Sequence, residues 1–215
     1  MHIKRSLKNG LYLSIRLVFI GLAKVLFKFE VRGTEHIPRI GAAIIASNHA
    51  SYLDPPLIGM AIPRPIFYFA KEELFRTLFG AALRIVNAIP VNRDQLDRKT
   101  LRTVLSVLAQ GEMILMFPEG TRSETGDLQE GRPGIGFIAY QAKVPVVPAY
   151  VGGSFDILPR GGKFFRFAQC TVTFGPAVDL SAYFAAARTK DMYERMSQEI
   201  MRSIEHLKRL HERTG

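Results

Sequence analysis

Short apolar runs alternate with longer amphipathic segments along this chain of 215 residues. Runs that are rich in β-branched and aromatic residues predict strands, because a strand buried on both faces reads as a brief continuous apolar stretch. The strand candidates are Phe29–Val31, Ala42–Ser47, Ile66–Ala70, Ala88–Asn92, Met113–Phe117 and Val146–Val151, with one or two more expected in Phe164–Phe174.

The segments between these runs carry apolar residues at helical spacing. The helix candidates are Glu72–Val86, Asp97–Gln110, Ile135–Gln141 and Asp191–Arg213. In the last of these, the apolar residues recur every three or four positions, which predicts one buried face of a closing helix. They are Met192, Met196, Ile200, Ile204 and Leu207. The alternation of strands and helices predicts an α/β fold with a mixed central sheet flanked by helices.

The first 29 residues form a segment that is both apolar and basic. It contains six Lys and Arg residues and no acidic residue. Arg16 and Lys24 interrupt the apolar run, so a helix lying in the membrane interface fits better than a span, which needs about 20 apolar residues. A short tilted span and packing on the globular domain stay open. No small-residue cleavage site follows, so we expect no removed signal peptide.

We therefore expect residues 1–29 to associate with the membrane and residues 30–215 to form one α/β domain. The net charge of +10, from 29 Lys and Arg against 19 Asp and Glu, calls for an acidic partner. The basic residues of the first segment are interleaved with Leu, Val and Phe, which favours an anionic membrane surface and not nucleic acid. The single cysteine, Cys170, excludes an internal disulfide and is interpreted as a packed residue. These features predict a location on the cytosolic face of the inner (plasma) membrane.

A histidine and an aspartate stand five positions apart, at His49 and Asp54. On a helix such residues point away from each other, so their pairing needs a turn. The buried run before His49 and the helix start at Asp54-Pro55-Pro56, with Asp54 at the cap, supply one. A carboxylate that accepts a hydrogen bond from one ring nitrogen leaves the other nitrogen as a base near neutral pH. In isolation, the two residues would more often be a loop histidine and a helix cap.

No nucleophile accompanies this pair. The chain lacks a Gly-x-Ser-x-Gly motif, and Ser51 is too weak a signal to nominate. We therefore expect the pair to activate the hydroxyl of a substrate. A second motif, Phe117–Ser123, follows an apolar run and predicts a loop at the carboxyl end of a sheet, where open α/β folds bind ligands. The backbone N–H groups near Gly120 and Thr121, with the Arg122 guanidinium, predict an anion cradle, although alone this loop reads equally well as an exposed turn.

Four motifs, in this order and spacing, resemble the four sequence blocks of the glycerolipid acyltransferases, above all the bacterial branch that acylates 1-acyl-glycerol 3-phosphate to phosphatidic acid. The motifs are Asn48–Asp54, Ile89–Arg93, Phe117–Ser123 and Val144–Tyr150, and the resemblance runs from about Val31 to Pro176. One departure concerns the second block, where Asn87–Pro90 stands at a place often occupied by a Gly ahead of the strand. This departure leaves the identity of the acyl acceptor open.

The resemblance implies a role for each matching residue. His49 would be the general base that takes the proton from the sn-2 hydroxyl of lysophosphatidic acid, and Asp54 would orient it. The hydroxyl would attack the acyl thioester directly, without a covalent acyl-enzyme. Residues of the second and third blocks expected to bind the glycerol phosphate are Arg93, Glu119, Gly120, Thr121 and Arg122. The family's Ala-Lys-x-Glu-Leu segment, which matches Ala70–Leu74, adds Lys71 as a further phosphate ligand. Pro148, in the fourth block, would contact the acyl donor or serve as scaffold.

Several alternatives stay open beside this interpretation. Without the resemblance, Lys71 and Arg93 read equally well as solvated surface cations. The donor is a co-substrate, either acyl-CoA or acyl carrier protein, and the acceptor could be another lysophospholipid or a lyso-aminolipid. Two other functions are alternatives, although they fit the motifs less well than an acyltransferase does. They are a thioester hydrolase that uses the same His-Asp pair and a non-catalytic basic module that binds membranes.

No metal and no cofactor are expected, because a thioester readily releases a thiolate and no His/Cys/Asp cluster has metal-binding spacing. The oxyanion donors are not visible, and backbone amides around the first or third block are candidates. An aromatic and aliphatic stripe could line an acyl tunnel, but plain core is the preferred interpretation for most of it. The stripe consists of Phe67, Tyr68, Phe69, Phe75, Leu78 and Phe79.

Overall fold

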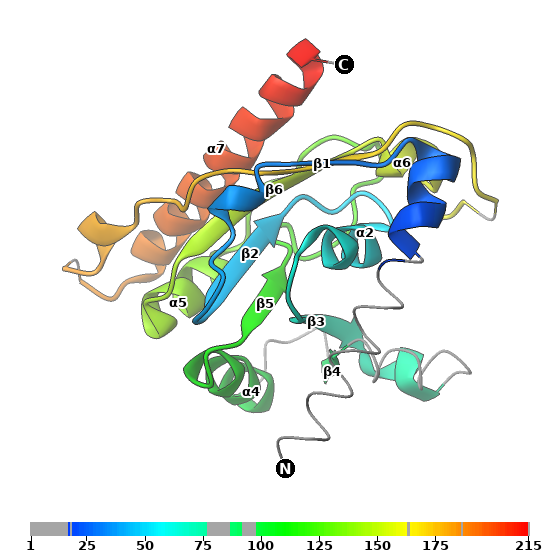
Figure 1. The fold of residues 1–215 in the computed structure, drawn as a ribbon. Helices are drawn as coiled ribbons and strands as arrows, with labels where there is room; N and C mark the ends of the chain where they lie inside the picture. Colours follow the sequence, from blue (N-terminus) through cyan, green and yellow to red (C-terminus); the bar gives the residue numbers. More distant parts are fainter. Residues whose placement is uncertain are drawn as a thin grey trace.

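One sheet of seven strands organises the part of the chain described by this computed structural model, residues 17, 19–76, 87–91, 98–162, 164–185 and 187–214. The strand order is β1-β7-β6-β2-β5-β3-β4 (Figure 1). The strands are β1 (Glu30–Arg32), β2 (Ala43–Ser47), β3 (Ile66–Lys71), β4 (Ala88–Val91), β5 (Met113–Met116), β6 (Val146–Gly152) and β7 (Thr171–Phe174).

The sheet is mixed, as the sequence predicts. Strands β6, β2, β5, β3 and β4 are mutually parallel, whereas β7 runs antiparallel to β6 and β1 runs parallel to β7. The carboxyl ends of the five parallel strands therefore reach the same edge of the sheet. Pro90 lies in β4, which is an edge strand, and an edge strand tolerates a residue that has no backbone N–H.

Helices cover both faces of the sheet (Figure 1). They are α2 (Asp54–Ala61), α4 (Arg98–Ala109), α5 (Pro133–Ala142), α6 (Ser154–Ile157) and α7 (Lys190–Thr214), with 3-10 turns η1 (Thr34–His36), η2 (Glu72–Arg76) and η3 (Ser181–Tyr183). Because strand side chains alternate, Ala43 and Ile45 of β2 pack with α2, whereas Ile44 and Ala46 pack with α4, α5 and α7. The central strand thus joins two apolar clusters.

The closing helix predicted for Asp191–Arg213 is confirmed as α7, which packs against α5 and β6. Its residues Met196, Ile200 and Ile204 are fully buried, as their spacing requires. The contact with α5 is close: a Cβ atom on Gly136 would lie 2.1 Å from the carbonyl oxygen of Tyr193. Only glycine permits this approach of the two helices.

One local prediction is wrong. Asp54 is the first residue of α2 and Leu53 is the cap, because the Asp54 carboxylate turns back toward the preceding loop. The strand expected within Phe164–Phe174 is confirmed as β7, Thr171–Phe174. The residues before it form no second strand, because Phe164 and Phe165 are neighbours and both are exposed, so they lack the one buried face that a half-buried strand needs.

Parts of other predictions lie outside the described residues. The segment Glu72–Val86 begins as η2, and residues 77–86 are not described. Of the aromatic stripe, Tyr68 is buried on one face of the sheet, and Phe67 and Phe69 pack on the other, so these three confirm the core interpretation. Leu78 and Phe79 fall in the undescribed range.

Residues 19–27 of the basic apolar segment are helical and residues 1–16 are not described. Leu17, Phe19 and Val25 are exposed, whereas Ala23 is buried in the cluster on the α2 face of the sheet. Among the described helices, none combines the length and the apolar character that crossing a membrane requires.

Candidate active site

The predicted motifs meet at the edge of the sheet where the parallel strands end. His49 follows β2, the Phe117–Ser123 loop follows β5, and Ser154 follows β6. Strands β2, β5 and β6 are direct neighbours, so residues distant in sequence are brought together at this edge. Open α/β sheets bind their ligands at such an edge.

His49 and Asp54 form a buried pair. Nδ1 of His49 lies 2.8 Å from Oδ2 of Asp54, and the two side chains are 4% and 0% exposed. The same Oδ2 accepts hydrogen bonds from the backbone N–H groups of Ala50, at 2.7 Å, and Ser51, at 2.8 Å. The tight turn that the pairing requires is therefore held by the carboxylate itself, which also lies at the positive end of the α2 dipole.

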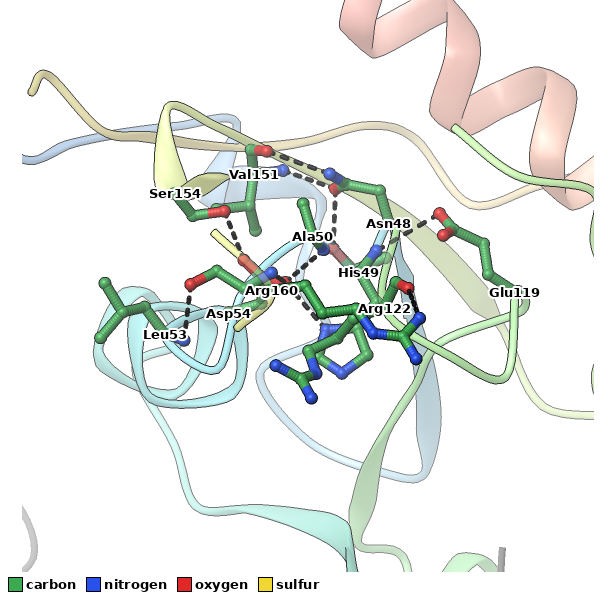
Figure 2. Close-up of polar contacts among 12 residues, drawn as sticks. Asn48, His49, Ala50, Leu53, Asp54, Glu119, Arg122, Val151, Ser154 and Arg160 are labelled. Atoms are coloured by element: carbon green, nitrogen blue, oxygen red, sulfur yellow. Dashed lines mark hydrogen bonds and ion pairs between the residues drawn. The ribbon is translucent and has the colours of Figure 1, made fainter. Parts of the chain in front are cut away.

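The other carboxylate oxygen of Asp54 is bound from α6. The Ser154 hydroxyl donates to Oδ1 at 2.5 Å, across a separation of 100 residues, and Figure 2 shows Asp54 between Ser154 and the His49 turn. With four donors around it, the buried Asp54 carboxylate is satisfied as an anion. Ser154 is not predicted from the sequence, where its only signal is a Gly-Gly-Ser one residue after the fourth block.

Asn48 joins the His49 loop to β6. Its side-chain amide donates to the carbonyl of Val151 at 3.0 Å and its oxygen accepts the Val151 N–H at 2.8 Å. Both bonds are buried and appear as a pair of dashed lines in Figure 2. The residue before the histidine is thus a clamp between two neighbouring strands.

The third motif encloses His49. The Phe117 ring stacks on the imidazole, with centroids 3.9 Å apart and planes 13° from parallel. The His49 backbone N–H donates to Oε1 of Glu119 at 3.3 Å, and its carbonyl accepts the N–H of Ser123 at 2.7 Å. The orientation of the imidazole is therefore determined by the ring stack, by the Asp54 carboxylate and by the fixed backbone.

Glu119 is 2% exposed, and its second oxygen accepts a hydrogen bond from Gln129 at 3.0 Å. Burial raises the pKa of this carboxyl to about 7, against the opposing effect of the hydrogen bonds from Gln129 and His49. The contacts show a positioning role for Glu119 behind the His49 backbone. A direct contact with the substrate stays a prediction.

The anion cradle predicted around Gly120 needs a correction. The Gly120 N–H donates to the carbonyl of Phe117 at 3.0 Å, so it closes a turn and is not an open anion donor. Its φ of +71° lies in the left-handed region that favours glycine, and an added Cβ would lie 2.9 Å from the Arg132 side chain, which would have to move. The backbone amides of the first block, which were candidates for oxyanion donors, need the same correction. The N–H groups of Ala50 and Ser51 already donate to the Asp54 carboxylate.

Arg122 is held by an aromatic ring. Its guanidinium carbon lies 3.4 Å from the centre of the Tyr52 ring, and its carbonyl accepts a hydrogen bond from Arg160 at 3.0 Å. Within the described ranges, Nη1 of Arg122 is buried and has no hydrogen-bond partner. A buried cationic donor without a partner is suited to an anionic ligand. The roles of Tyr52 and Arg160 are not predicted by the sequence analysis.

The remaining predicted binding residues are only partly described. Lys71 is the last residue of β3 and so reaches the same edge, but its side chain and all of Arg93 lie outside the described part of the chain. The Thr121 carbonyl accepts a hydrogen bond from Gln129 at 3.2 Å. Pro148 is buried within β6, and its carbonyl accepts the N–H of Gly175 at 2.9 Å, so the structure favours a scaffold role.

Other reactive groups do not converge here. No cluster of three His, Cys, Asp or Glu residues in the described ranges could hold a metal ion. Burial raises the pKa of the Cys170 thiol to about 12, and this residue is packed in the core, as predicted.

The profile of the Acyltransferase family matches residues 28–152. A 1-acyl-sn-glycerol-3-phosphate acyltransferase of Bacillus subtilis (strain 168) is 31% identical over 182 residues, which cover 83% of this chain and 87% of that protein. The human 1-acyl-sn-glycerol-3-phosphate acyltransferase alpha is 32% identical over 187 residues, which cover 81% of this chain and 62% of the human protein.

A solved structure agrees with these sequence matches. The 1-acyl-sn-glycerophosphate acyltransferase PlsC from Thermotoga maritima superposes with a TM-score of 0.69 and 27% identity, covering 84% of this chain and 72% of that chain. The resemblance stated from the four motifs is confirmed.

Proposed function

This chain belongs to the acyltransferase family, and we propose that it moves a fatty acyl group from an acyl thioester to the sn-2 hydroxyl of 1-acyl-glycerol 3-phosphate, giving phosphatidic acid. Relatives from bacteria and animals bear names that describe this acyl acceptor, which supports the choice. The observation that carries the proposal is the buried His49–Asp54 pair, beside a loop whose Arg122 has an unpartnered buried nitrogen.

His49 acts as the general base. Because Asp54 accepts a hydrogen bond from Nδ1–H, the lone pair of the neutral imidazole lies on Nε2. The sn-2 hydroxyl gives its proton to Nε2 while its oxygen attacks the thioester carbonyl carbon. The tetrahedral adduct then expels the thiolate, which takes the proton from the imidazolium. A positioned base of this kind contributes roughly 10²- to 10⁴-fold to the rate.

Direct attack by the substrate agrees with the serines near the pair. The Ser51 hydroxyl donates to the carbonyl of Leu158 at 2.7 Å, and the Ser154 hydroxyl donates to Asp54. Both therefore have structural roles, and no covalent acyl-enzyme is needed. Asp54, buried beside the ring, stabilises the imidazolium that forms during the reaction.

The substrate phosphate binds to Arg122, with Lys71 and Arg93 as further ligands. The phosphate is a short distance from the reacting hydroxyl in 1-acyl-glycerol 3-phosphate, so holding it also places the hydroxyl at the base. Such positioning can supply roughly 7–11 kcal/mol of the barrier, more than the base itself. The donor in this proposal is acyl-CoA or acyl carrier protein.

The enzyme works at the cytosolic face of a membrane, where its lipid substrate resides, and residues 1–29 bind it to the lipid surface. The absence of acidic residues from this segment and the exposure of Leu17, Phe19 and Val25 support this part of the proposal. Flotation with anionic vesicles tests it: a Phe19→Ser/Val25→Ser variant should bind more weakly than the original chain, and equal binding would contradict it.

An acyl-transfer assay tests the reaction. The purified chain is given a panel of lysolipids with acyl-CoA or acyl carrier protein, and products are identified by mass spectrometry. We expect phosphatidic acid from 1-acyl-glycerol 3-phosphate, and a loss of about 10³-fold or more for His49→Ala. His206→Ala, which alters an exposed histidine of α7, is the matched control.

Three other results of the acyl-transfer assay would contradict the proposal. Free fatty acid released without any lysolipid would indicate a thioester hydrolase. Faster acylation of a different lysolipid would show that the acceptor is wrong, and transfer by His49→Ala at the original rate would refute the assignment of the base.

A further inference from the structure

Large apolar side chains that are exposed concentrate in two segments of the described chain. Of eleven such residues, five lie in residues 17–26 and three in residues 164–167. Phe164, Phe165 and Phe167 are 82%, 62% and 83% exposed. Single exposed apolar residues are ordinary, but a contiguous group of large ones marks an interaction surface. We call Phe164, Phe165, Arg166 and Phe167 the aromatic loop.

The aromatic loop lies beside the end of the N-terminal helix. Three residues after Phe167, the N–H of Cys170 donates to the carbonyl of Phe27 at 2.9 Å. The carbonyl of Cys170 in turn accepts the N–H of Glu30 at 3.0 Å. In Figure 1 the N-terminal helix, in dark blue, and the chain that leads from α6 to β7, in yellow, lie at the same side of the molecule. The two exposed apolar groups therefore belong to one surface.

This surface carries positive charge and no acidic residue over long stretches. The chain has no Asp or Glu from residue 159 to residue 178, or before Glu30. Arg160, Arg166, Lys24 and Lys28 are exposed within or beside the apolar groups. Arg160 pairs with Glu124, its Nη1 3.1 Å from Oε1, so Arg166, Lys24 and Lys28 supply the positive charge here. Exposed phenylalanines next to these cations match a lipid interface, because the rings enter the acyl boundary while the cations reach anionic headgroups.

The same loop continues into the active site. The carbonyl of Leu158 accepts the hydroxyl of Ser51, three residues before Asp54. Arg160 donates to the carbonyl of Arg122 at 3.0 Å, and the N–H of Arg166 donates to the carbonyl of Ile157 at 2.8 Å. A surface docked through the aromatic loop would therefore lie next to the phosphate-binding side of the site.

We propose that the aromatic loop is a second membrane contact that docks this enzyme on an anionic phospholipid bilayer together with the N-terminal helix. The two contacts orient the domain, so that the edge of the sheet bearing His49 faces the lipid from which the substrate comes. The docking rests on the membrane contact of residues 1–29 in the proposed function and adds a second contact to it, and it does not depend on the identity of the acyl acceptor.

Tryptophan fluorescence tests the proposal directly, because the chain contains no Trp. Phe167→Trp places a single probe in the aromatic loop. Ile40→Trp is the matched control, since Ile40 is 86% exposed but precedes β2 and so lies at the end of that strand away from His49. With phosphatidylglycerol vesicles, we expect the Phe167→Trp emission to shift to shorter wavelength and to be quenched by brominated acyl chains, and the Ile40→Trp emission to stay unchanged.

A binding measurement complements the probe. The triple variant Phe164→Ser/Phe165→Ser/Phe167→Ser should partition onto the same vesicles about tenfold or more weakly than the original chain, because apolar rings leave the interface. Ile40→Ser should partition like the original chain. Circular dichroism checks that each variant is folded, which is expected because the altered side chains are exposed.

Three results would overturn the proposal. One is an unchanged Phe167→Trp emission while the protein is bound to vesicles, and another is an equal shift for Ile40→Trp. The third is a shift caused by soluble acyl carrier protein and not by vesicles, which would make the loop a protein contact. All measurements are repeated with His49→Ala, so a failure of docking is seen independently of catalysis.

Discussion

Replacing Asp54 by Asn removes the negative charge behind His49 while its hydrogen bonds can persist. Oδ2 of Asp54 accepts hydrogen bonds from His49, Ala50 and Ser51, whereas among the described residues Oδ1 accepts only the Ser154 hydroxyl. An asparagine would place its oxygen at the Oδ2 position, because an NH₂ group there would face three donors. Its NH₂ would then point at Ser154, whose hydroxyl can rotate to accept. The Nδ1–H tautomer of His49 is preserved.

The loss of rate follows from the missing charge. The Nδ1 and Oδ2 atoms are 2.8 Å apart, and both side chains are buried. An ion pair with charge centres about 4 Å apart is worth about 4 kcal/mol at an effective dielectric constant of about 20. The amide oxygen keeps part of this as an ordinary hydrogen bond, so the imidazolium loses roughly 3–4 kcal/mol. Each increase of about 1.4 kcal/mol in the activation free energy lowers the rate tenfold, so we expect kcat to fall about 10²- to 10³-fold.

Steady-state acyl transfer and thermal unfolding separate the charge from the fold. Asp54→Asn should show this fall in kcat with little change in KM for 1-acyl-glycerol 3-phosphate and a Tm close to the original. Asp54→Ala should unfold at a distinctly lower temperature, because it leaves several buried donors unpaired at about 1–3 kcal/mol each. Asp156→Asn, which removes an exposed acid of α6, is the matched control for charge and should change neither quantity.

Two results would refute this reasoning. A fall in kcat of less than about tenfold would show that the charge does not stabilise the reacting imidazole. A fall well beyond about 10⁴-fold with an unchanged Tm would show that the amide is reversed and the wrong tautomer is held.

The other predictions concern groups around the pair. Because burial raises the pKa of Glu119 from 4.5 to about 7, its contribution to stability is present below pH 4.5 and is lost as the pH rises through 7. Between these pH values, the free energy of unfolding of the original chain, measured in urea, should fall by up to about 3 kcal/mol relative to that of Glu119→Gln. Parallel pH profiles of the two proteins would contradict the burial effect. Ser154→Ala removes one of the four hydrogen-bond donors to Asp54, so we expect its free energy of unfolding in urea to fall by about 1–2 kcal/mol and its kcat to fall several-fold. A Tm and a kcat equal to those of the original chain would show that this hydrogen bond contributes nothing. Asn48→Ala leaves the N–H and carbonyl of Val151 unpaired, so its free energy of unfolding should fall by roughly 2–4 kcal/mol, and a loss below about 1 kcal/mol would mean that water replaces the amide.

Much of the fold can be predicted from local pattern. The runs that become β2, β3, β5 and β6, and the apolar face of α7, are found within a residue or two of their positions in the structure, because burial on both faces or on one stripe leaves a direct mark on the sequence. The order of the strands in the sheet is not visible in this way. Residues 164–170 also fail the pattern, since exposed aromatics resemble strand residues until their exposure is known.

The site is predictable where its partners are near in sequence. His49 and Asp54 are five positions apart, so a turn between a buried run and a helix start suffices to predict their contact. Ser154 is 100 residues from Asp54 and has no spacing that could reveal it. The same is true of the stack of Phe117 on His49, which depends on β2 and β5 being neighbours.

The sequence by itself determined which residues are candidates for the chemistry, because the His-Asp spacing, the Phe117–Ser123 loop and the apolar periods are local and need no knowledge of distant contacts. Only the tertiary structure decided what those residues do to one another. It placed Glu119 behind the His49 backbone, used the Gly120 N–H in a turn, and left one nitrogen of Arg122 buried without a partner among the described residues. The physical reason is that burial, desolvation and hydrogen-bond competition depend on every group that packs around a side chain, and these groups come from strands far apart in the chain.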